Sequence, residues 1–341
     1  DVFGEWSEYE FRGIDINKIK LLNNRFILKR KKNGFLRSRF YTILIFLSSI
    51  VPFLKLLKKN DYNFIIAHLI TSVPILLFLF IKTNTKLILS IAGHPKINFM
   101  RKFIWKISSK KLFKIICPSN ELKNILKNLN IFTEDKITVI QDPHLSIKKI
   151  KELKIEKIND PFFDGSKVLI SVGRLTKQKN YTFLLLNFKK LLTKYRDIKL
   201  LIIGSGEEKK ILQNLITKLK IEDKVKLLGY EKNIYRYLKN SNFYISTSIW
   251  EGSSLAMIDA AYMGLPLLCS NCPAGRKEFI EKDKRGFLFN EGDSKNFLYK
   301  FDKMYKSNFN DNKTRLINAK KEVRNFTLFR YYLCMAKILN N

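Results

Sequence analysis

Two short stretches in the second half of the chain carry residue types that hold anionic ligands. The first stretch contains Gly173 and Arg174 at the end of an apolar run, with Lys179 five positions after the arginine. Glycine lets the backbone approach a ligand closely, and two cations beside a helix N-terminus suit a phosphate or diphosphate. In so basic a chain, a pair of solvated side chains is the alternative interpretation.

The second stretch is Trp250–Glu251–Gly252–Ser253–Ser254, which also follows an apolar run. A carboxylate followed by glycine and two hydroxyl residues predicts a loop of free backbone N–H groups that opens a helix. Asp259 lies eight positions after Glu251 among apolar residues, where a lone carboxylate is costly unless it is paired or lies in a cleft. Helix capping would explain Glu251 but not Asp259.

A third candidate, Gly204–Ser205–Gly206, is less specific. It does not match GxGxxG, and Glu207 and Glu208 would repel a phosphate where the following helix begins. We interpret these residues as a tight turn from a strand into a helix.

The elements that position these stretches follow a regular rhythm from residue 167 onward. Short runs rich in Val and Ile alternate with longer amphipathic runs, which predicts βαβ units and a doubly wound parallel sheet. Ligands bind such a sheet in the loops after the carboxyl ends of its strands. We expect strands at residues 167–175, 198–204, 225–228, 243–247, 265–269 and 286–289, and helices at 181–193, 207–219, 234–239, 254–262, 297–305 and 314–323.

The first half shows the same rhythm less cleanly. Strands are expected at residues 64–67, 87–91, 115–117 and 137–140, and helices at 72–81, 99–110 and 120–128. Four strands make an incomplete Rossmann-like domain, so we expect the natural start of the chain to be missing. The charged residues 146–157, followed by Asn159–Asp160–Pro161, predict a linker between two domains.

Length and composition agree with two globular domains. The chain has 341 residues, of which 46% are hydrophobic, and about 150 residues is typical of one domain. This composition excludes disorder, collagen and a small disulfide-stabilised scaffold. The apolar runs at residues 41–51 and 69–81 are shorter than the roughly 20 residues of a membrane-spanning helix. The first residues show no basic-then-apolar leader, so no signal peptide is expected.

The net charge of +34 is unevenly distributed. Residues 16–120 contain 21 Lys and Arg but one acid, whereas the remainder contains 43 against 29. Such a surface attracts polyanions or an anionic membrane leaflet. The cluster Lys29–Lys32, followed by apolar residues 40–51, is typical of a membrane-surface element, or equally of a solvated loop before a core helix. Lysine enrichment from AT-rich coding sequence is the simpler reason for much of the charge.

The four cysteines do not form a disulfide framework. Cys269 and Cys272 have the spacing of half a zinc site, but no second pair or nearby histidine completes it. We expect Cys269 to be a buried thiol at a strand end and the protein to be cytosolic and reduced.

Together these motifs resemble the retaining glycosyltransferases of family 4. In the first half the likeness is looser, at residues 90–95, which include His94, and at 140–143; residues 326–338 are similar to the last helix of that family. Across about residues 167–290 the likeness is specific in order and spacing, and it is carried by Gly173–Arg174–Leu175 with Lys179, Gly229, Glu251–Gly252 with Asp259, Gly264–Leu265–Pro266, and Gly275 with Glu278.

The resemblance implies the α/β GT-B fold, in which two Rossmann-like doubly wound domains face each other across a cleft. Residues 1–150 would form the acceptor-side domain, 151–322 the nucleotide-sugar domain, and 323–341 a helix that crosses back to the first domain. The first strand of the family and its glycine-rich loop have no match here, so the first domain is expected to lack its N-terminal strand.

The resemblance also implies roles for individual residues. Arg174 and Lys179 would hold the donor diphosphate and neutralise the leaving group, a role that replaces a metal ion. Glu251 would face the donor sugar, Asp259 would bind the ribose although it is one methylene shorter than the usual glutamate, and His94 would lie near the transferred sugar. The expected catalytic residues are thus His94 and Glu251, and the other expected donor-binding residues are Gly173, Gly229, Gly252, Ser253, Ser254 and Leu255.

The function implied is transfer of a sugar, with retention, from a nucleotide-diphosphate sugar (a UDP-sugar is favoured) to a glycan or a polyprenyl-linked or other lipid acceptor. The enzyme would work without a metal or cofactor, as a peripheral protein on the cytoplasmic face of the membrane, in bacterial polysaccharide or lipopolysaccharide biosynthesis. The alternatives are a non-catalytic relative with this fold and a basic protein that binds nucleic acid or membranes. Because the basic half has no recognisable nucleic-acid motif, no nucleic-acid partner is expected.

Overall fold

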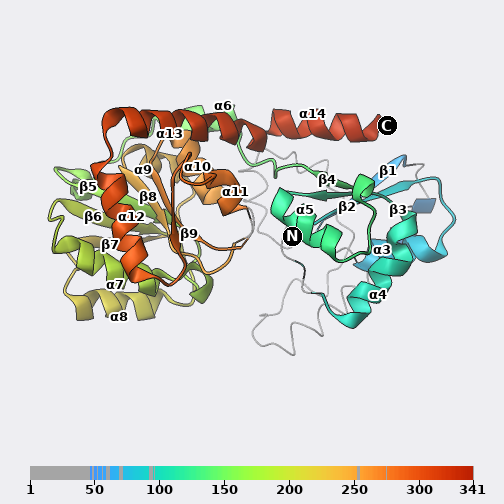
Figure 1. The fold of residues 1–341 in the computed structure, drawn as a ribbon, viewed down its shortest axis with the longest axis horizontal. Helices are drawn as coiled ribbons and strands as arrows, with labels where there is room; N and C mark the ends of the chain where they lie inside the picture. Colours follow the sequence, from blue (N-terminus) through green and yellow to red (C-terminus); the bar gives the residue numbers. More distant parts are fainter. Residues whose placement is uncertain are drawn as a thin grey trace. The chain divides into compact units, whose positions relative to one another are not determined.

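The computed structural model describes residues 62–68, 72–91, 95, 97–251, 254–273 and 275–340, together with 47, 50, 51, 53–55, 57 and 58. These residues form two compact units (Figure 1). Apart from residues 118–122, which are grouped with the second unit, the chain passes from the first unit to the second between Val139 and Ile140. Among the described residues, no helix is long and apolar enough to cross a membrane.

The first unit contains a parallel sheet in the order β1-β2-β3-β4. Its core includes strand residues such as Leu87, Ile88 and Ile115, which are fully buried. The strands are β1 (Phe64–His68), β2 (Lys86–Ser90), β3 (Leu112–Cys117) and β4 (Ile137–Val139), and the helices are α3 (Ser72–Phe80), α4 (Phe99–Ser108) and α5 (Asn120–Asn128).

The second unit contains a parallel sheet in the order β10-β9-β8-β5-β6-β7. Its strands are β5 (Lys167–Val172), β6 (Ile198–Ile203), β7 (Val225–Gly229), β8 (Phe243–Ser246), β9 (Leu267–Asn271) and β10 (Phe287–Asn290). Its helices are α6 (Ile147–Leu153), α7 (Tyr181–Leu192), α8 (Lys209–Leu219), α9 (Tyr235–Lys239), α10 (Leu255–Met263), α11 (Arg276–Ile280), α12 (Ser294–Lys306), α13 (Phe309–Glu322) and α14 (Leu328–Leu339).

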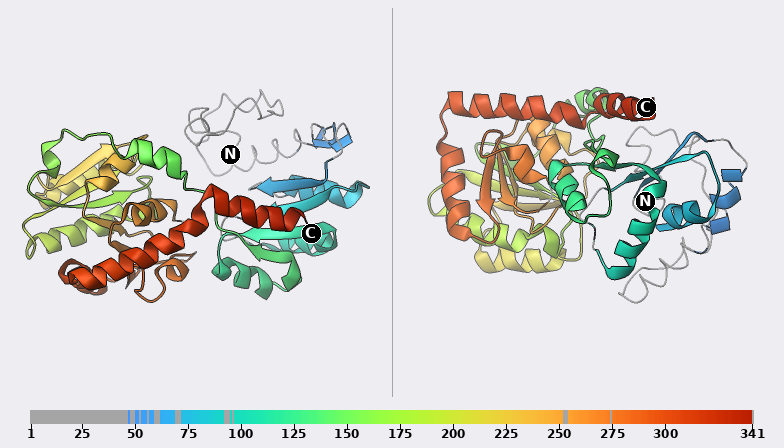
Figure 2. Two further views of the ribbon diagram at one scale, coloured as in Figure 1. Left: turned by 90° about the horizontal axis from the view of Figure 1, so that it is seen from above. Right: turned by 45° about the vertical axis from the view of Figure 1, so that its right-hand side comes forward.

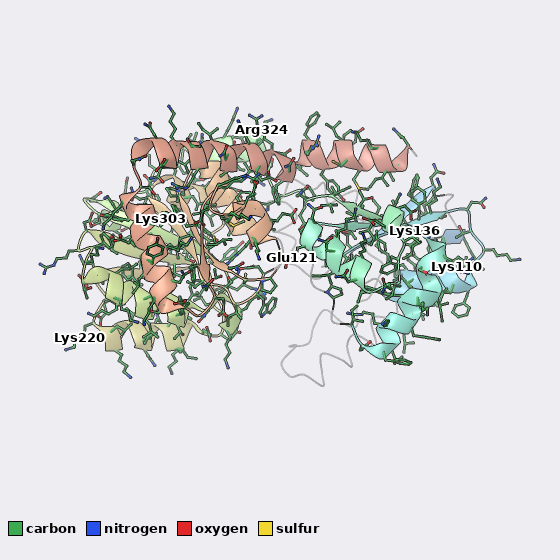
Figure 3. All side chains as sticks on the ribbon, in the orientation of Figure 1. Lys110, Glu121, Lys136, Lys220, Lys303 and Arg324 are labelled. Atoms are coloured by element: carbon green, nitrogen blue, oxygen red, sulfur yellow. The ribbon has the colours of Figure 1, made fainter. Side chains whose placement is uncertain are left out.

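Helices cover both faces of this sheet (Figures 1 and 2). Helices α7, α8 and α12 bury one face, and α6, α9, α10 and α13 bury the other. Burial on both faces explains why β5 and β6 are continuous apolar runs rather than alternating ones. Most lysines among the described residues lie at the surface, as Lys220 does at the end of α8 (Figure 3).

Two elements differ from the sequence-based expectations. The predicted linker at residues 146–157 contains helix α6, which buries Ile150 at 1% exposure, and the Asn233 side chain donates to the Leu153 carbonyl at 2.8 Å. The short helix α11 was not predicted. The proposed membrane-surface element at residues 29–51 lies outside the described residues, apart from residues 47, 50 and 51.

None of the described cysteines forms a disulfide. Cys269 is fully buried, as predicted, but it is the middle residue of β9 and not the end of a strand. Burial raises the pKa of its thiol to about 12, which leaves the thiol protonated and unreactive near neutral pH.

Candidate functional site

The two sequence stretches meet because the strands that carry them are neighbours. β5 pairs with β6 on one side and with β8 on the other, and all three run parallel. The chain therefore moves from β5 to β7 in one direction and returns to place β8 on the other side of β5. This is the topological switch point of the sheet, outside which ligands bind in open α/β folds.

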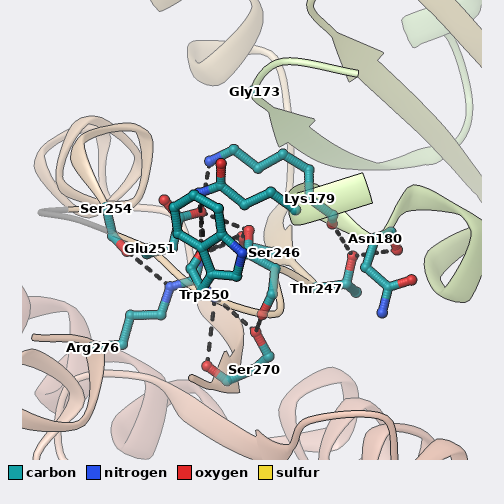
Figure 4. Close-up of polar contacts among 12 residues, drawn as sticks. Gly173, Lys179, Asn180, Ser246, Thr247, Trp250, Glu251, Ser254, Ser270 and Arg276 are labelled. Carbon is teal, nitrogen blue, oxygen red and sulfur yellow. Dashed lines mark hydrogen bonds and ion pairs between the residues drawn. The ribbon is translucent and has the colours of Figure 1, made fainter. Parts of the chain in front are cut away.

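Hydrogen bonds fasten the loop after β5 to the loop after β8. The Thr247 hydroxyl lies 3.0 Å from the carbonyl oxygens of both Lys179 and Asn180 and donates to them. The Ile249 N–H donates to the Gln178 carbonyl at 2.9 Å, and the Gln178 amide donates to the Trp250 carbonyl at 2.8 Å. The backbone on either side of Lys179 is thereby held against the residues that lead to Glu251 (Figure 4).

Lys179 and Glu251 form an ion pair at the centre of this arrangement. Lys179 Nζ lies 2.6 Å from Glu251 Oε1, and the two side chains are 18% and 7% exposed. Gly173 makes room for the lysine, since a Cβ atom at that position would lie 2.9 Å from Lys179 Cε. Gly173, which was predicted to allow close approach of a ligand, thus also leaves space for the aliphatic part of the Lys179 side chain.

The surroundings of Glu251 keep its carboxylate ionised. Burial alone would raise the pKa of Glu251, but the charges of Arg276 and Lys179 and hydrogen bonds from Lys179 and Ser248 outweigh burial and hold the pKa below its ordinary value. The Ser248 hydroxyl donates to Glu251 Oε1 at 2.6 Å. An ionised, nearly buried carboxylate beside two cations is therefore the main electrostatic feature of the site.

The other predicted donor residues that the structure describes lie in the loop after β5, at the end of β7 and at the start of α10. Arg174 is exposed, and its Nη2 lies 3.5 Å from Gln178 Oε1. Gly229 ends β7 with φ +91° and has open space where a side chain would be. Ser254 precedes α10 with φ +46°, and Leu255 is the first residue of that helix. His94, Gly252 and Ser253 lie outside the described residues.

Asp259 lies in α10 with polar partners from two other segments. Its side chain is nearly buried, at 3% exposure for the residue. Asp259 Oδ2 lies 2.8 Å from His144 Nε2, and the Tyr235 hydroxyl donates to Oδ1 at 2.8 Å. Burial raises the pKa of Tyr235 well above its usual value, and the Asp259 charge adds to this effect, so the phenol remains a donor. The sequence indicated that burial of this lone carboxylate would be unfavourable, and these two hydrogen-bond partners compensate for it.

The sequence analysis missed Arg276, Tyr235 and His144. Arg276 follows Gly275 in a segment that reads as ordinary basic surface, yet it is 1% exposed and contacts Glu251 Oε1 through Nη2 at 3.1 Å. Charged residues are rarely buried without a partner, but a sequence alone does not show which arginine is buried. Tyr235 likewise resembled a core aromatic residue.

The chain matches a family model described as "Glycosyl transferases group 1" over residues 154–323. It is 32% identical over 285 residues to an uncharacterised glycosyltransferase of Methanocaldococcus jannaschii, a match that covers 78% of this chain and 67% of that protein. A second relative, from Campylobacter jejuni, is named N-acetylgalactosamine-N,N'-diacetylbacillosaminyl-diphospho-undecaprenol 4-alpha-N-acetylgalactosaminyltransferase; it is 30% identical over 68% of this chain and 65% of its own length. The chain thus spans about two thirds of both relatives.

The fold is similar to that of solved structures as well. Anabaena HepE in complex with UDP superimposes with a TM-score of 0.70 at 16% identity, over 85% of this chain and 82% of that one. Two parallel α/β units of this kind define the GT-B fold. The chain belongs to the group 1 glycosyl transferases.

Proposed function

We propose that this chain transfers a sugar from a nucleotide-diphosphate sugar to a glycan or lipid-linked acceptor, with retention of configuration. The observation that carries the proposal is the Lys179–Glu251 ion pair at the switch point of the second sheet, with Arg174 in the same loop as Lys179. Two cations and a fixed carboxylate at this position suit a donor that has both a diphosphate and a sugar.

Two relatives support the choice of substrates. HepE was crystallised with UDP, which favours a UDP-sugar donor. The name of the Campylobacter relative specifies a diphospho-undecaprenol acceptor, which favours a lipid-linked acceptor and work at the cytoplasmic face of a membrane, in assembly of a bacterial polysaccharide. These assignments are proposals for this chain.

In this proposal, Arg174 and Lys179 neutralise the diphosphate as it leaves, a role that in other enzymes belongs to a metal ion. No metal or cofactor is therefore proposed. Glu251 is proposed to face the donor sugar, and His94, which lies outside the described residues, is proposed to act near the transferred group. The remaining proposed donor-binding residues would allow close backbone approach or offer N–H groups; they are Gly173, Gly229, Gly252, Ser253, Ser254 and Leu255.

Asp259 is proposed to contact the ribose in competition with its present partners. A carboxylate offers about four lone-pair positions, so two hydrogen bonds leave acceptor capacity. At 3% exposure, however, Asp259 can be reached by a ribose hydroxyl only if neighbouring side chains move.

The donor proposal is tested by a thermal-shift panel of UDP, GDP, ADP and CMP. A ligand at about 100 times its dissociation constant adds about 2.7 kcal/mol of stability, and we expect UDP to give this increase and CMP to give none. A sugar-transfer assay with radiolabelled UDP-sugars and membrane extracts follows. If no nucleotide raises the melting temperature at millimolar concentration, the donor proposal is wrong; if UDP binds but no sugar is transferred or hydrolysed, the chain is a non-catalytic relative.

We also propose that helix α4 binds an anionic membrane surface. One face of α4 exposes Phe99, Met100, Phe103 and Ile107, with exposed fractions of 84%, 69%, 58% and 48%, whereas the opposite face buries Trp105. Lys102 and Lys106 are exposed beside the apolar face. An apolar stripe next to lysines is typical of a helix that lies in the plane of a membrane with anionic lipids.

Replacing Phe99 and Phe103 together by serine is expected to weaken binding to anionic vesicles by at least tenfold. Burial of one phenylalanine contributes about 1.5–3 kcal/mol, and 1.4 kcal/mol is a factor of about 10. Vesicle co-sedimentation measures this effect, with neutral vesicles and high salt as comparisons. The control is Ile211→Ser, which changes an apolar residue of α8 that is 57% exposed. Equal binding by the double variant and wild type would refute a role for α4.

A further inference from the structure

Arg276 has a buried hydrogen-bond network around all three nitrogens of its guanidinium. The residue is 1% exposed and begins helix α11. Its Nε donates to Ser254 Oγ at 2.9 Å, Nη1 to Ser270 Oγ at 2.8 Å, and Nη2 to Ser246 Oγ at 2.6 Å and to Glu251 Oε1 at 3.1 Å (Figure 4). Nη2 also lies 3.4 Å from Ser248 Oγ, and Nη1 lies 3.5 Å from the Ser270 carbonyl.

These serines come from separate segments of the second unit. Ser246 ends β8, Ser248 lies in the following loop, Ser254 precedes α10 and Ser270 lies in β9. Hydroxyl groups satisfy the N–H donors of a guanidinium but carry no charge. The carboxylate of Glu251 is therefore the group that compensates the buried positive charge, and a buried charge is costly without such a partner.

Glu251 has two cationic partners on the same oxygen. Its Oε1 lies 2.6 Å from Lys179 Nζ and 3.1 Å from Arg276 Nη2. The Lys179 side chain is 18% exposed, whereas that of Arg276 is 1% exposed. Lys179 can thus turn toward a ligand while Arg276 stays beside Glu251. An arginine cannot lose its proton in a protein, so Arg276 is a permanent counter-charge.

We propose that Arg276 is a positioning residue of the donor site. Arg276 holds Glu251 in place and compensates its negative charge when Lys179 leaves Glu251 to bind the donor diphosphate. This inference rests on the proposed function, because it needs a diphosphate that attracts Lys179. Without Arg276, the departure of Lys179 would leave a carboxylate that is 7% exposed and has no cation beside it. Such a group takes up a proton instead of remaining charged.

The titratable and charged groups that interact electrostatically with Glu251 are few among the described residues. They are Lys179 from the turn before α7, Arg276 from α11, Tyr181 from α7, Tyr244 from β8, Cys269 within β9, and Cys272 directly after β9. Burial raises the pKa of both tyrosines and both cysteines, so all four are neutral near pH 7. Charge compensation of Glu251 there depends on Lys179 and Arg276.

The test is UDP binding by titration calorimetry to wild type, Arg276→Met and Arg276→Lys, each in buffers of different ionisation enthalpy. Arg276→Met is expected to bind UDP at least tenfold more weakly, as loss of a charged hydrogen-bond partner implies, and to take up about one additional proton per UDP bound. Its affinity should therefore fall further as the pH rises. Arg276→Lys, which restores a cation, should regain the proton uptake of wild type and part of the affinity.

The control is Arg315→Met, which removes an arginine of α13 that donates to the Asp283 carbonyl and lies over the Phe287 ring; its UDP binding should match wild type. If Arg276→Met binds UDP with the proton uptake of wild type, the inference is wrong, and Arg276 has a structural role alone. If Arg276→Met does not fold, the UDP affinity of Arg276→Lys is compared in two backgrounds, wild type and Glu251→Gln. An equal loss of affinity in both backgrounds overturns the inference, whereas a loss that disappears with Glu251→Gln supports it.

Failure of the proposed function gives a different result. In that case the wild-type protein itself does not bind UDP, and both the donor-site proposal and the inference on Arg276 are wrong. Binding to wild type with no difference among the variants overturns the inference alone.

Discussion

Replacement of Lys179 by methionine is expected to abolish stabilisation of the protein by UDP and to lower kcat/KM for sugar transfer by at least about a hundredfold. Removal of one group that stabilises a developing anion typically lowers kcat by about 10²–10³. The fold should survive, because methionine keeps most of the apolar stem that packs over Gly173, and Glu251 retains Arg276 as a counter-charge. The loss would therefore report on the ligand and not on folding.

The measurements are the melting temperature with and without UDP and steady-state transfer from a UDP-sugar. The matched control is Lys177→Met, since Lys177 is an exposed lysine in the same short 3-10 turn, and it should behave as wild type. A Lys179→Met protein that is stabilised by UDP as strongly as wild type would show that the diphosphate binds elsewhere.

The sheet of the second unit could be predicted from the sequence because its strands are buried on both faces. Continuous apolar runs at residues 167–172 and 198–203 indicate buried parallel strands when amphipathic runs separate them. The ends of the elements were predicted less well: the predicted strand at 167–175 ends at Val172, because Gly173 and Arg174 already belong to the loop. Helix α6 was not predicted because its many lysines made the segment resemble a charged linker. Its apolar residues, such as Ile150, pack into the core of the second unit.

The pairing of Lys179 with Glu251 was only partly predictable. Each residue could be placed after a strand, but adjacency of β5 and β8 depends on the order of strands in the sheet, which local sequence patterns do not contain. The family likeness supplied that order indirectly. The role of Arg276 depends further on four serines from separate segments, and a serine in a loop has no sequence signal that shows which arginine it will contact.

Asp259 illustrates the same limit. A lone acid in an apolar helix indicates a partner or a cleft, but the partners are 115 residues away at His144 and 24 residues away at Tyr235. The physical reasoning identified the energetic problem correctly, while the packing of distant segments determined its solution.

Replacement of Gly204 by alanine is expected to destabilise the protein by about 3–5 kcal/mol, the sum of overpacking and backbone strain. Gly204 follows β6 with φ +150°, and a Cβ atom there would lie 1.9 Å from the carbonyl oxygen of Gly173. The conflict is with backbone and cannot be relieved by rotating a side chain. Gly173 N–H donates to the Ile203 carbonyl at 2.9 Å, so relief requires the ends of β5 and β6 to separate, which displaces Arg174.

Thermal unfolding measures this effect, and the matched control is Gly292→Ala. Gly292 has φ +74° but no atom within 4 Å of the position of a Cβ, so its replacement should cost only the strain of a left-handed backbone, about 1–2 kcal/mol. Since about 1 kcal/mol lowers the melting temperature by roughly 2–4 °C in a unit of this size, the two variants should differ clearly. Equal losses would mean that the ends of β5 and β6 adjust without cost. A large loss for Gly204→Ala alone, with weaker UDP binding by the protein that remains folded, would show a second role for this turn. The turn, which the sequence predicted only as a tight connection from a strand into a helix, would then also set the position of the donor-binding loop.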